Sequence, residues 1–237
     1  VDVAADAWIP VMSLPYVLGI DPQGGDPAPP YIHPDAERVA AIRARLDRDG
    51  ARLHVGLSWA GNPVMLNNRR RSMPLAALAP LLAREDVAWY SLQRGDGEDQ
   101  IPGVPEARRL HLPDERNDFD GKAALIGALD LVVSVCTSTA HLAGAMGRPL
   151  WVMLTHVPDW RWGLALPTTR WYPRARLFRQ PTLGDWASVM RDVSVRDQAI
   201  EVLGQKLAMP LILGPVGIAG MFARRAEVQA AKAAEAA

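Results

Sequence analysis

The sequence has little cysteine, and its opposite charges balance. Cys136 is the one cysteine among 237 residues. This excludes an internal disulfide framework and argues against zinc sites built on cysteine. It also indicates a reducing compartment, so we expect a cytoplasmic protein. Lysine plus arginine and aspartate plus glutamate each number 26. The chain therefore lacks the basic field that recruits nucleic acid, and we expect no nucleic-acid partner.

Long uncharged runs are also scarce. The longest one, residues 207–222 ("LAMPLILGPVGIAGMF"), contains two prolines and three glycines and is shorter than the roughly 20 residues that a membrane-spanning helix needs. We expect a packed or frayed terminal segment here rather than a membrane segment. It belongs to a predicted tail, 206–237, whose alanine-rich end is helix-prone by composition.

The middle of the chain alternates between strand and helix patterns. It follows a linker rich in proline and glycine at 21–35. The predicted helices are 36–50, 74–85, 120–130, 139–146 and one within 185–205, and the predicted strands are 53–60, 87–93, 107–112, 131–135, 149–154 and 175–180. This alternation predicts a Rossmann-like α/β domain over 35–205, a parallel sheet of five or six strands with helices on both faces. We expect Asp120 to cap the 120–130 helix.

In open parallel sheets, ligands bind beyond the carboxyl ends of the strands. The loop 59–72 ("WAGNPVMLNNRRRS") offers Gly61 for close approach, Asn62 for hydrogen bonds and three adjacent arginines. The arginines alone also fit a solvated basic run. In the loop 91–99, Gln93 and Arg94 are suited to a ribose or a phosphate, although an acidic surface turn explains the loop equally well.

The stretch 134–150 ("SVCTSTAHLAGAMGRPL") marks the handover from a buried strand to a helix. Thr137 and Ser138 present hydroxyls and backbone N–H groups where the helix dipole favours an anion, and His141 lies one turn further on. A capped helix with a buried histidine is the alternative. The neighbouring arginines favour a phosphate site, although neither GxxxxGK[ST] nor GxGxxG is present.

A further loop, 155–180, mixes aromatic residues with arginines. Trp160, Arg161 and Trp162 are candidates for contacts to a base or sugar. The alternative is a structured loop whose aromatic rings plug the edge of the sheet. No metal-ligand spacing occurs in the sequence, and we expect no metal and no cofactor.

Four motifs, taken in order, resemble a known group of proteins: "VGLSWAGNP…RRRSMPL", "YSLQRG", "AALIGALDLVVSVCTSTAHLAGAMGRPLWVML" and "PDWRW…WYPRARLFRQ". They look like the C-terminal half of bacterial glycosyltransferase-like proteins, often preceded by tetratricopeptide repeats and related to the heptosyltransferase (ADP-heptose:LPS) family. The resemblance implies a GT-B fold of two Rossmann-like domains. Residues 1–34 would then be a packed remnant of the first domain with its linker, and 35–205 the domain that binds a nucleotide-diphosphate sugar.

The resemblance also assigns donor contacts by position. The residues assigned are Thr137, Ser138, His141, Asn62, Arg71, Ser72, Gln93 and Arg94. Two positions depart from the family pattern, because Cys136 and Asn68 stand where aspartate is usual. A thiol cannot accept the hydrogen bonds that a carboxylate accepts. We expect the helix dipole and nearby arginines to lower the pKa of Cys136.

Three functions fit these observations. The first is the donor-binding portion of a hexosyl- or heptosyltransferase acting on a protein or glycan. The second is a binding or scaffold module that has kept the pocket and lost activity, which the missing carboxylates favour. A weaker third is a sugar-nucleotide epimerase. No aspartate or glutamate can be named as the general base, which the resemblance places on the first domain. Donor hydrolysis would separate the first two functions.

Overall fold

The computed structural model describes residues 7–10, 13–21, 30–65, 68–195, 200–202 and 205–207. The chain forms two units, Val1–Ser194 and Val195–Ala237. In the described part of the second unit, β7 (Ile200–Val202) pairs antiparallel with β8 (Gln205–Leu207). Residues 208–237, with most of the predicted tail, lie outside the described residues.

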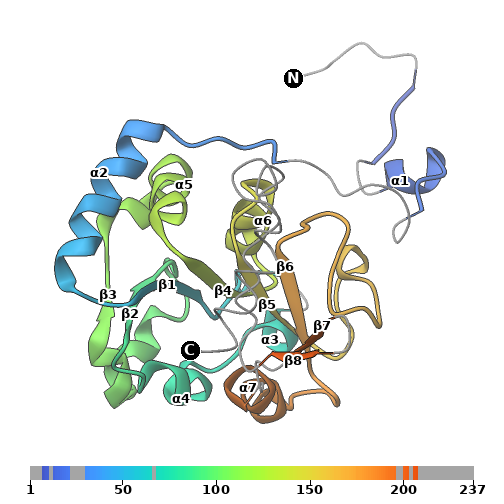
Figure 1. Cartoon of the computed structure of the whole chain (residues 1–237). Helices are drawn as coiled ribbons and strands as arrows, with labels where there is room; N and C mark the ends of the chain where they lie inside the picture. The colour runs from blue at the N-terminus through green and yellow to red at the C-terminus, as the bar shows by residue number, and fades with distance from the viewer. Residues whose placement is uncertain are drawn as a thin grey trace. The chain divides into compact units, whose positions relative to one another are not determined.

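The first unit is built on a parallel sheet of six strands (Figure 1). The strands are β1 (Leu53–Ser58), β2 (Val87–Ser91), β3 (Leu110–His111), β4 (Leu131–Val135), β5 (Leu150–Leu154) and β6 (Ala175–Arg179). Their order across the sheet is β3-β2-β1-β4-β5-β6, and every neighbouring pair is parallel. The chain therefore builds the sheet outward from β1 to β3, returns to the middle, and continues outward on the other side from β4 to β6. The two halves meet between β1 and β4. Such a switch point is where open sheets bind ligands.

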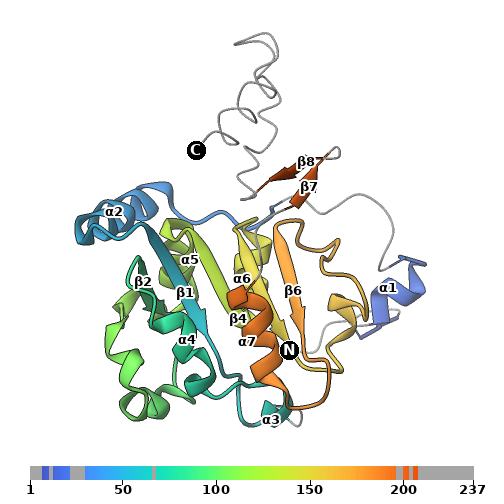
Figure 2. The ribbon, with the colours of Figure 1, turned by 60° about the horizontal axis from the view of Figure 1, so that its bottom comes forward.

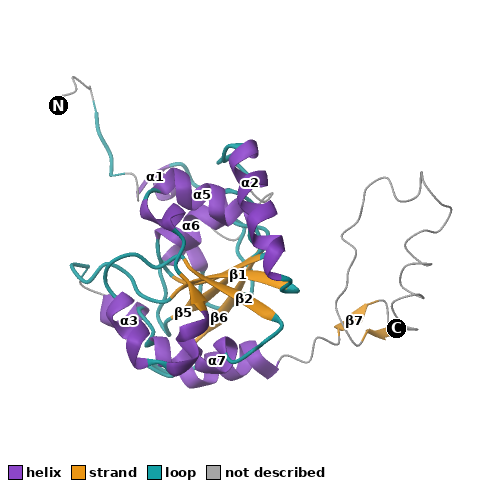
Figure 3. Ribbon diagram, turned by 90° about the vertical axis from the view of Figure 1, so that its left-hand side faces the viewer, coloured by secondary structure: helices purple, strands orange, loops and turns teal. Residues whose placement is uncertain are grey.

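The described α-helices are α1 (Leu14–Val17), α2 (Ala36–Leu46), α3 (Asn68–Arg71), α4 (Ala79–Leu82), α5 (Phe119–Ala128), α6 (Ser138–Ala145) and α7 (Trp186–Val195). Some of them cover the two faces of the sheet. α2, α5 and α6 lie on one face and α7 lies on the other (Figure 3). A second view shows α4 and α7 in front of the strands on that other face (Figure 2).

Each face of the sheet carries its own hydrophobic core. On the first, Leu46 of α2 and Leu125 of α5 pack with strand residues such as Val132. On the second, Trp186 of α7 packs with residues such as Val133. Val132 and Val133 are adjacent and both about 1% exposed, as expected for a strand covered on both sides. Each fully buried side chain of this size contributes roughly 1.5–3 kcal/mol.

The predicted fold class is confirmed, with six strands, but three local predictions are wrong. The 74–85 helix is a 3₁₀ turn, Leu75–Leu78, followed by the short α4. Pro80 has no N–H to continue a helix from residue 75. Of the predicted strand 107–112, only Leu110–His111 pairs with β2, because Pro105–Arg109 forms another 3₁₀ turn.

The third error concerns the cap of α5. The cap is Asp118, not Asp120, because Asp118 has an extended backbone and its Oδ1 accepts a hydrogen bond from Gly121 N at 2.6 Å. Asp120 lies inside the first turn of the helix. Both residues precede the same apolar pattern, and the pattern alone does not fix which one leaves the helix.

Most of the described residues before 22 are exposed. Trp8 is 85% and Tyr16 is 89% exposed, and α1 has no buried residue. Residues 7–10 and 13–21 thus contribute no side chain to a core, and their assignment to a first domain remains a prediction. Closer to the domain, the amides of Tyr31 and Ile32 both donate to Ala145 O, at the end of α6. In the described part of the chain, no helix combines the length and apolarity of a membrane span.

Candidate functional site

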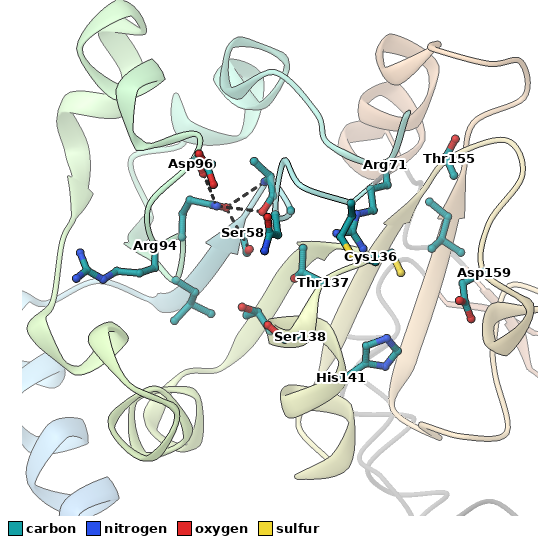
Figure 4. Close-up of a pocket in the computed structure, with 18 of the residues that line it drawn as sticks. Ser58, Arg71, Arg94, Asp96, Cys136, Thr137, Ser138, His141, Thr155 and Asp159 are labelled. Carbon is teal, nitrogen blue, oxygen red and sulfur yellow. Dashed lines mark hydrogen bonds between the residues drawn. The ribbon is translucent and has the colours of Figure 1, made fainter. Parts of the chain in front are cut away.

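A cleft of about 1240 Å³ opens in the first unit beyond the carboxyl ends of β1, β2, β4 and β5 (Figure 4). Its walls come from the loops that follow these strands and from the first turn of α5. The cleft thus lies at the switch point between β1 and β4. Its size exceeds the roughly 300–1,000 Å³ of ordinary small-molecule pockets.

The N-terminus of α6 faces this cleft without a side-chain cap. Thr137 is the N-cap residue, with extended backbone (φ −137°, ψ 173°), and its side chain accepts no bond from the first turn. Its Oγ1 instead lies 3.1 Å from Oγ of Ser134, which donates to Val135 O. Ser138 is exposed and lines the cleft. No acidic residue lies in the first turn, so this helix end suits an anion.

Arg71 reaches the same part of the cleft from the loop after β1 (Figure 4). Its Nε donates to Asn68 Oδ1 at 3.3 Å. Gly61 makes room for this arrangement, because a Cβ there would lie 2.8 Å from Arg71 Nε. The atoms that approach the Gly61 backbone closely therefore belong to Asn68 and Arg71, side chains of the same loop.

The other polar residues of this loop hold its shape. Ser72 Oγ donates to Asn68 Oδ1 and accepts from Gly61 N, both at 3.0 Å. Ser72 does not line the main cleft, but Asn62 does. Asn62 Oδ1 accepts from Val64 N at 2.9 Å and closes a turn. Ser72 thus holds Asn68, the partner of Arg71, and Asn62 holds its own turn.

Gln93 ties the loop after β1 to the loop after β2. It is 4% exposed. Its Oε1 accepts from the backbone amides of Trp59 and Ala60 at 3.1 and 3.0 Å, and its Nε2 donates to Ala60 O and Asp96 O. Both ends of the amide are therefore engaged by the protein. The contact to a ligand that was predicted for this residue remains a prediction.

A second group of cationic side chains lines the cleft beside α5, and it consists of Arg94, Arg116 and Lys122. Figure 4 shows Arg94 on the opposite side of the cleft from Arg71. Arg116 pairs with Glu98 at 2.7 Å and donates to Gln93 O. Lys122, which the sequence analysis missed, donates from its ammonium to none of the described residues. Burial, Arg116 and Arg94 lower its pKa, and Glu98 opposes them.

His141 lies between two aromatic side chains. Its Nδ1 is 2.9 Å from Tyr172 Oη, and its ring stacks on Trp162 with centroids 5.0 Å apart. Burial, followed by the charge of Arg161, lowers its pKa to about 4, against the opposing charge of Asp159. The imidazole is therefore neutral at physiological pH.

The three candidates in the loop after β5 differ in position. Trp162 is 1% exposed and supports His141 from below the cleft surface. Trp160 is 39% exposed and packs edge-on against Trp171, outside the residues that line the cleft. Arg161 lines the cleft and pairs with Asp159 at 2.8 Å. The structure therefore brings one of the three, Arg161, to the cleft surface.

Cys136 corrects one expectation. Burial raises the pKa of its thiol, and neither the hydrogen bond from Trp162 nor the charges of Arg71 and Arg161 reverse that effect. Trp162 Nε1 donates to the Cys136 sulfur at 3.1 Å. The thiol is thus a neutral acceptor that holds the indole. Desolvation outweighs the hydrogen bond and the arginine charges here, a balance that cannot be read from the sequence.

Sequence reasoning missed two further residues of the site, Phe119 and Lys122 of α5. It considered Tyr172 as one of the aromatic residues of the 155–180 loop, but not its contact with His141. Asp118, Phe119 and Lys122 all belong to the start of α5, which lines the cleft. These residues could have been found from the sequence only if the start of this helix had been placed beside the cleft. No group of three His, Cys, Asp or Glu side chains among the described residues is placed to hold a metal ion.

Comparison with known proteins divides the chain into two parts. Protein FlbA of Caulobacter vibrioides is 33% identical over 174 residues, which are 68% of this chain and 29% of FlbA. Among solved structures, the Escherichia coli ADP-heptose lps heptosyltransferase II matches with a TM-score of 0.48 and 16% identity, over 69% of this chain and 52% of that one.

The second part has a different relationship. Residues 185–237 match the FMN-dependent dehydrogenase family. An L-lactate dehydrogenase of Actinobacillus pleuropneumoniae is 62% identical over 47 residues, 20% of this chain and 12% of the enzyme. In this region the sequence analysis had predicted a helix within 185–205, which α7 confirms, and a tail described only by its composition. Within the match, α7 packs on the six-stranded sheet, with Trp186 and Met190 buried.

Proposed function

We propose that the six-stranded unit is the donor-binding portion of a glycosyltransferase that uses a nucleotide-diphosphate sugar. The observation that carries the proposal is the uncapped N-terminus of α6, which meets Arg71 and His141 in one cleft at the β1/β4 switch point. The order of motifs along the sequence supports it. The donor is a substrate, and the proposal involves no metal and no cofactor.

In this proposal, the described residues stabilise the leaving group of the transfer reaction. A departing nucleoside diphosphate carries growing negative charge, which preorganised N–H donors and cations stabilise. Helix α6 provides the N–H groups, Ser138 a hydroxyl, and Arg71 and Arg161 fixed charges. The ion pair with Asp159 partly offsets the positive charge of Arg161. These groups bind and stabilise the leaving diphosphate in this proposal.

The other half of the reaction, activation of the acceptor, needs a general base, which the resemblance places on the first domain. Among carboxylates, one whose pKa is raised toward neutral suits that role. The pKa of Asp159 is lowered, because its bonds and charge interaction with Arg161 outweigh burial. Asp118 is engaged as the cap of α5. We therefore propose that the base comes from outside the described residues, and that the acceptor is a protein or a glycan.

The second candidate is a nucleotide-sugar-binding module without activity. It is favoured by Cys136, whose thiol accepts from Trp162 where the resembling family has a carboxylate. Both candidates place the protein in the cytoplasm. The dehydrogenase relatives share only about an eighth of their length with this chain, and we propose no flavin chemistry for it.

Calorimetric titration tests the binding that both candidates require. ADP, UDP, GDP and the matching monophosphates are titrated into the full chain, and we expect a diphosphate to bind more tightly than its monophosphate. His141→Ala should weaken binding by about 1–3 kcal/mol, the effect of losing a bond to a charged group. His33→Ala, at an exposed position, is the control. Absence of binding by every diphosphate would refute the proposal.

Release of free sugar or nucleotide from a donor separates the two candidates. UDP-, ADP- and GDP-sugars are incubated with the full chain, and nucleoside diphosphate is measured by chromatography. Turnover supports the transferase, and binding without turnover supports the inactive module.

A further inference from the structure

We propose that Tyr172 is a positioning residue that fixes the tautomer of His141, so that a neutral imidazole presents Nε2–H to an anionic oxygen of the ligand. The choice of a phosphate oxygen as that acceptor rests on the proposed function. The tautomer itself can be measured without any ligand.

The first step is the geometry around the ring. Tyr172 Oη lies 2.9 Å from His141 Nδ1, and the face of the imidazole stacks on Trp162. Trp162 is itself held by its bond to the Cys136 sulfur. One nitrogen and one face of the ring are thus fixed by the protein. The other nitrogen, Nε2, bonds to none of the described residues, and His141 lines the cleft.

The second step is the placement of Tyr172 itself. Its ring lies against α6 at Gly144, where a Cβ would overlap the ring. Tyr172 is 8% exposed, and its side chain hydrogen-bonds with Tyr31. Burial, followed by the charge interaction and the hydrogen bond with Tyr31, raises the pKa of the phenol, so Tyr172 keeps its proton. A glycine on one helix and a phenol from a distant loop together set the position of the imidazole.

The third step is the direction of the hydrogen bonds. Phosphate oxygens accept and do not donate, so Nε2 must carry a proton to bind one. In a neutral imidazole, Nδ1 is then the acceptor, and Tyr172 is the donor to it. The Tyr172 hydroxyl thus donates to His141 Nδ1, and Nε2–H of the same ring faces the cleft.

The charged groups around the ring agree with a neutral imidazole. Arg161 and Asp159 face His141 from the loop after β5 and oppose each other. Cys136 is a neutral thiol, and Arg71 approaches it from the loop after β1. Tyr172 is a neutral phenol. The cations of the site are thus arginines, which keep their charge at all physiological pH values. His141 therefore contributes a directed hydrogen bond and no charge.

Proton–nitrogen correlation spectra of the histidine rings test the proposal on the ligand-free chain. We expect His141 to be a single neutral Nε2–H tautomer between about pH 5.5 and 8. In Tyr172→Phe, which keeps the ring, we expect a mixture of tautomers. Tyr16→Phe, at an exposed tyrosine, should leave the spectrum unchanged. A mixture in the wild type, or the wild-type spectrum in Tyr172→Phe, would overturn the proposal.

Nucleotide affinity gives a second readout. Titration of ADP or UDP, whichever binds the wild type, should show constant affinity across the same pH range, apart from the titration of the phosphate itself. Tyr172→Phe should bind about fivefold more weakly with the fold retained. Gly144→Ala should act in the same direction by displacing Tyr172. Failure of every nucleotide to bind, with the tautomer fixed as expected, would refute the proposed function and leave the tautomer assignment intact. Normal binding by both variants would overturn the role of Tyr172.

Discussion

Two helices direct their N-termini at the same cleft, and one side chain makes them different. The N-cap residues Asp118 of α5 and Thr137 of α6 have nearly identical backbones, with φ of −133° and −137° and ψ of 170° and 173°. Asp118 Oδ1 accepts from Gly121 N at 2.6 Å. The Thr137 hydroxyl turns back to Ser134 and leaves its helix uncapped.

This difference shows that a helix end becomes an anion site through what its cap leaves unsatisfied. A carboxylate at the N-cap satisfies an N–H group and offsets the positive end of the dipole. The α5 end is therefore closed to an anion by its own residue. The α6 end keeps both its N–H groups and its dipole available, with Arg71 beside it.

Thr137→Asp should close α6 in the way that α5 is closed, and it has the largest expected effect. The new carboxylate would cap the helix and repel a phosphate, so nucleoside diphosphate affinity should fall about 100-fold, or about 2.7 kcal/mol. Thermal stability should be retained or increased. Calorimetry and thermal unfolding measure the two effects. Thr137→Ser is the matched control, and wild-type affinity in Thr137→Asp would place the ligand elsewhere.

Arg71→Ala tests the cation beside the open end, with Arg94→Ala testing the cation on the far side of the cleft. Loss of a charge-assisted bond from Arg71 should weaken diphosphate binding about 30-fold, or about 2 kcal/mol. Arg94 lies apart from α6 (Figure 4), so its removal should have a smaller effect. Arg108→Ala, at an exposed position outside the cleft, is the control. Equal losses for Arg71 and Arg94 would contradict the comparison of the two sides.

The sequence was informative about the sheet and about this helix end for the same reason. Uninterrupted apolar strands such as 131–135 and the small polar residues after them are local patterns, and they predicted both β4 and the α6 N-terminus. The cap of α5 was misplaced by two residues, because Asp118 and Asp120 are chemically equivalent in the sequence. Only the backbone geometry separates them.

Long-range contacts account for what the sequence could not give. The lowered pKa of His141 depends on burial and on Arg161, and its ring nitrogen contacts Tyr172, 31 residues later. The raised pKa of Cys136 depends on burial that the whole domain creates. Gln93 was predicted to meet a ligand, and its buried bonds to the loop after β1 became visible only when two strands were placed side by side.

The pH dependence of stability sharpens the comparison at the α6 end. His141 titrates near 6.5 in the unfolded chain and at about 4 in the folded protein. The unfolded state therefore binds more protons between these values, and stability must fall as pH decreases from about 6.5 to 4. We expect a loss of about 2 kcal/mol, allowing for solvent screening of a partly exposed ring.

His141→Gln should remove that part of the pH dependence. Urea unfolding at a series of pH values measures it, because the midpoint reports stability at each pH. His33→Gln, at an exposed position, should keep the wild-type slope. A slope in His141→Gln equal to that of the wild type would show that the folded-state imidazole is not held neutral.

Asp118→Ala has the smallest expected effect, and it completes the comparison from the side of α5. Loss of an N-cap carboxylate costs about 1 kcal/mol, which corresponds to a decrease in melting temperature of roughly 2–4 °C for a domain of this size. Affinity for ADP or UDP should change less than about threefold, since the α5 end is not the one that holds the diphosphate. Asp118→Asn, which keeps a capping oxygen, should recover most of the stability. Thr137→Asp and Asp118→Ala then act in opposite ways, the first on binding and the second on stability. A large loss of nucleotide affinity in Asp118→Ala would mean that the ligand contacts both helix ends, and the contrast between them would no longer determine where the anion binds.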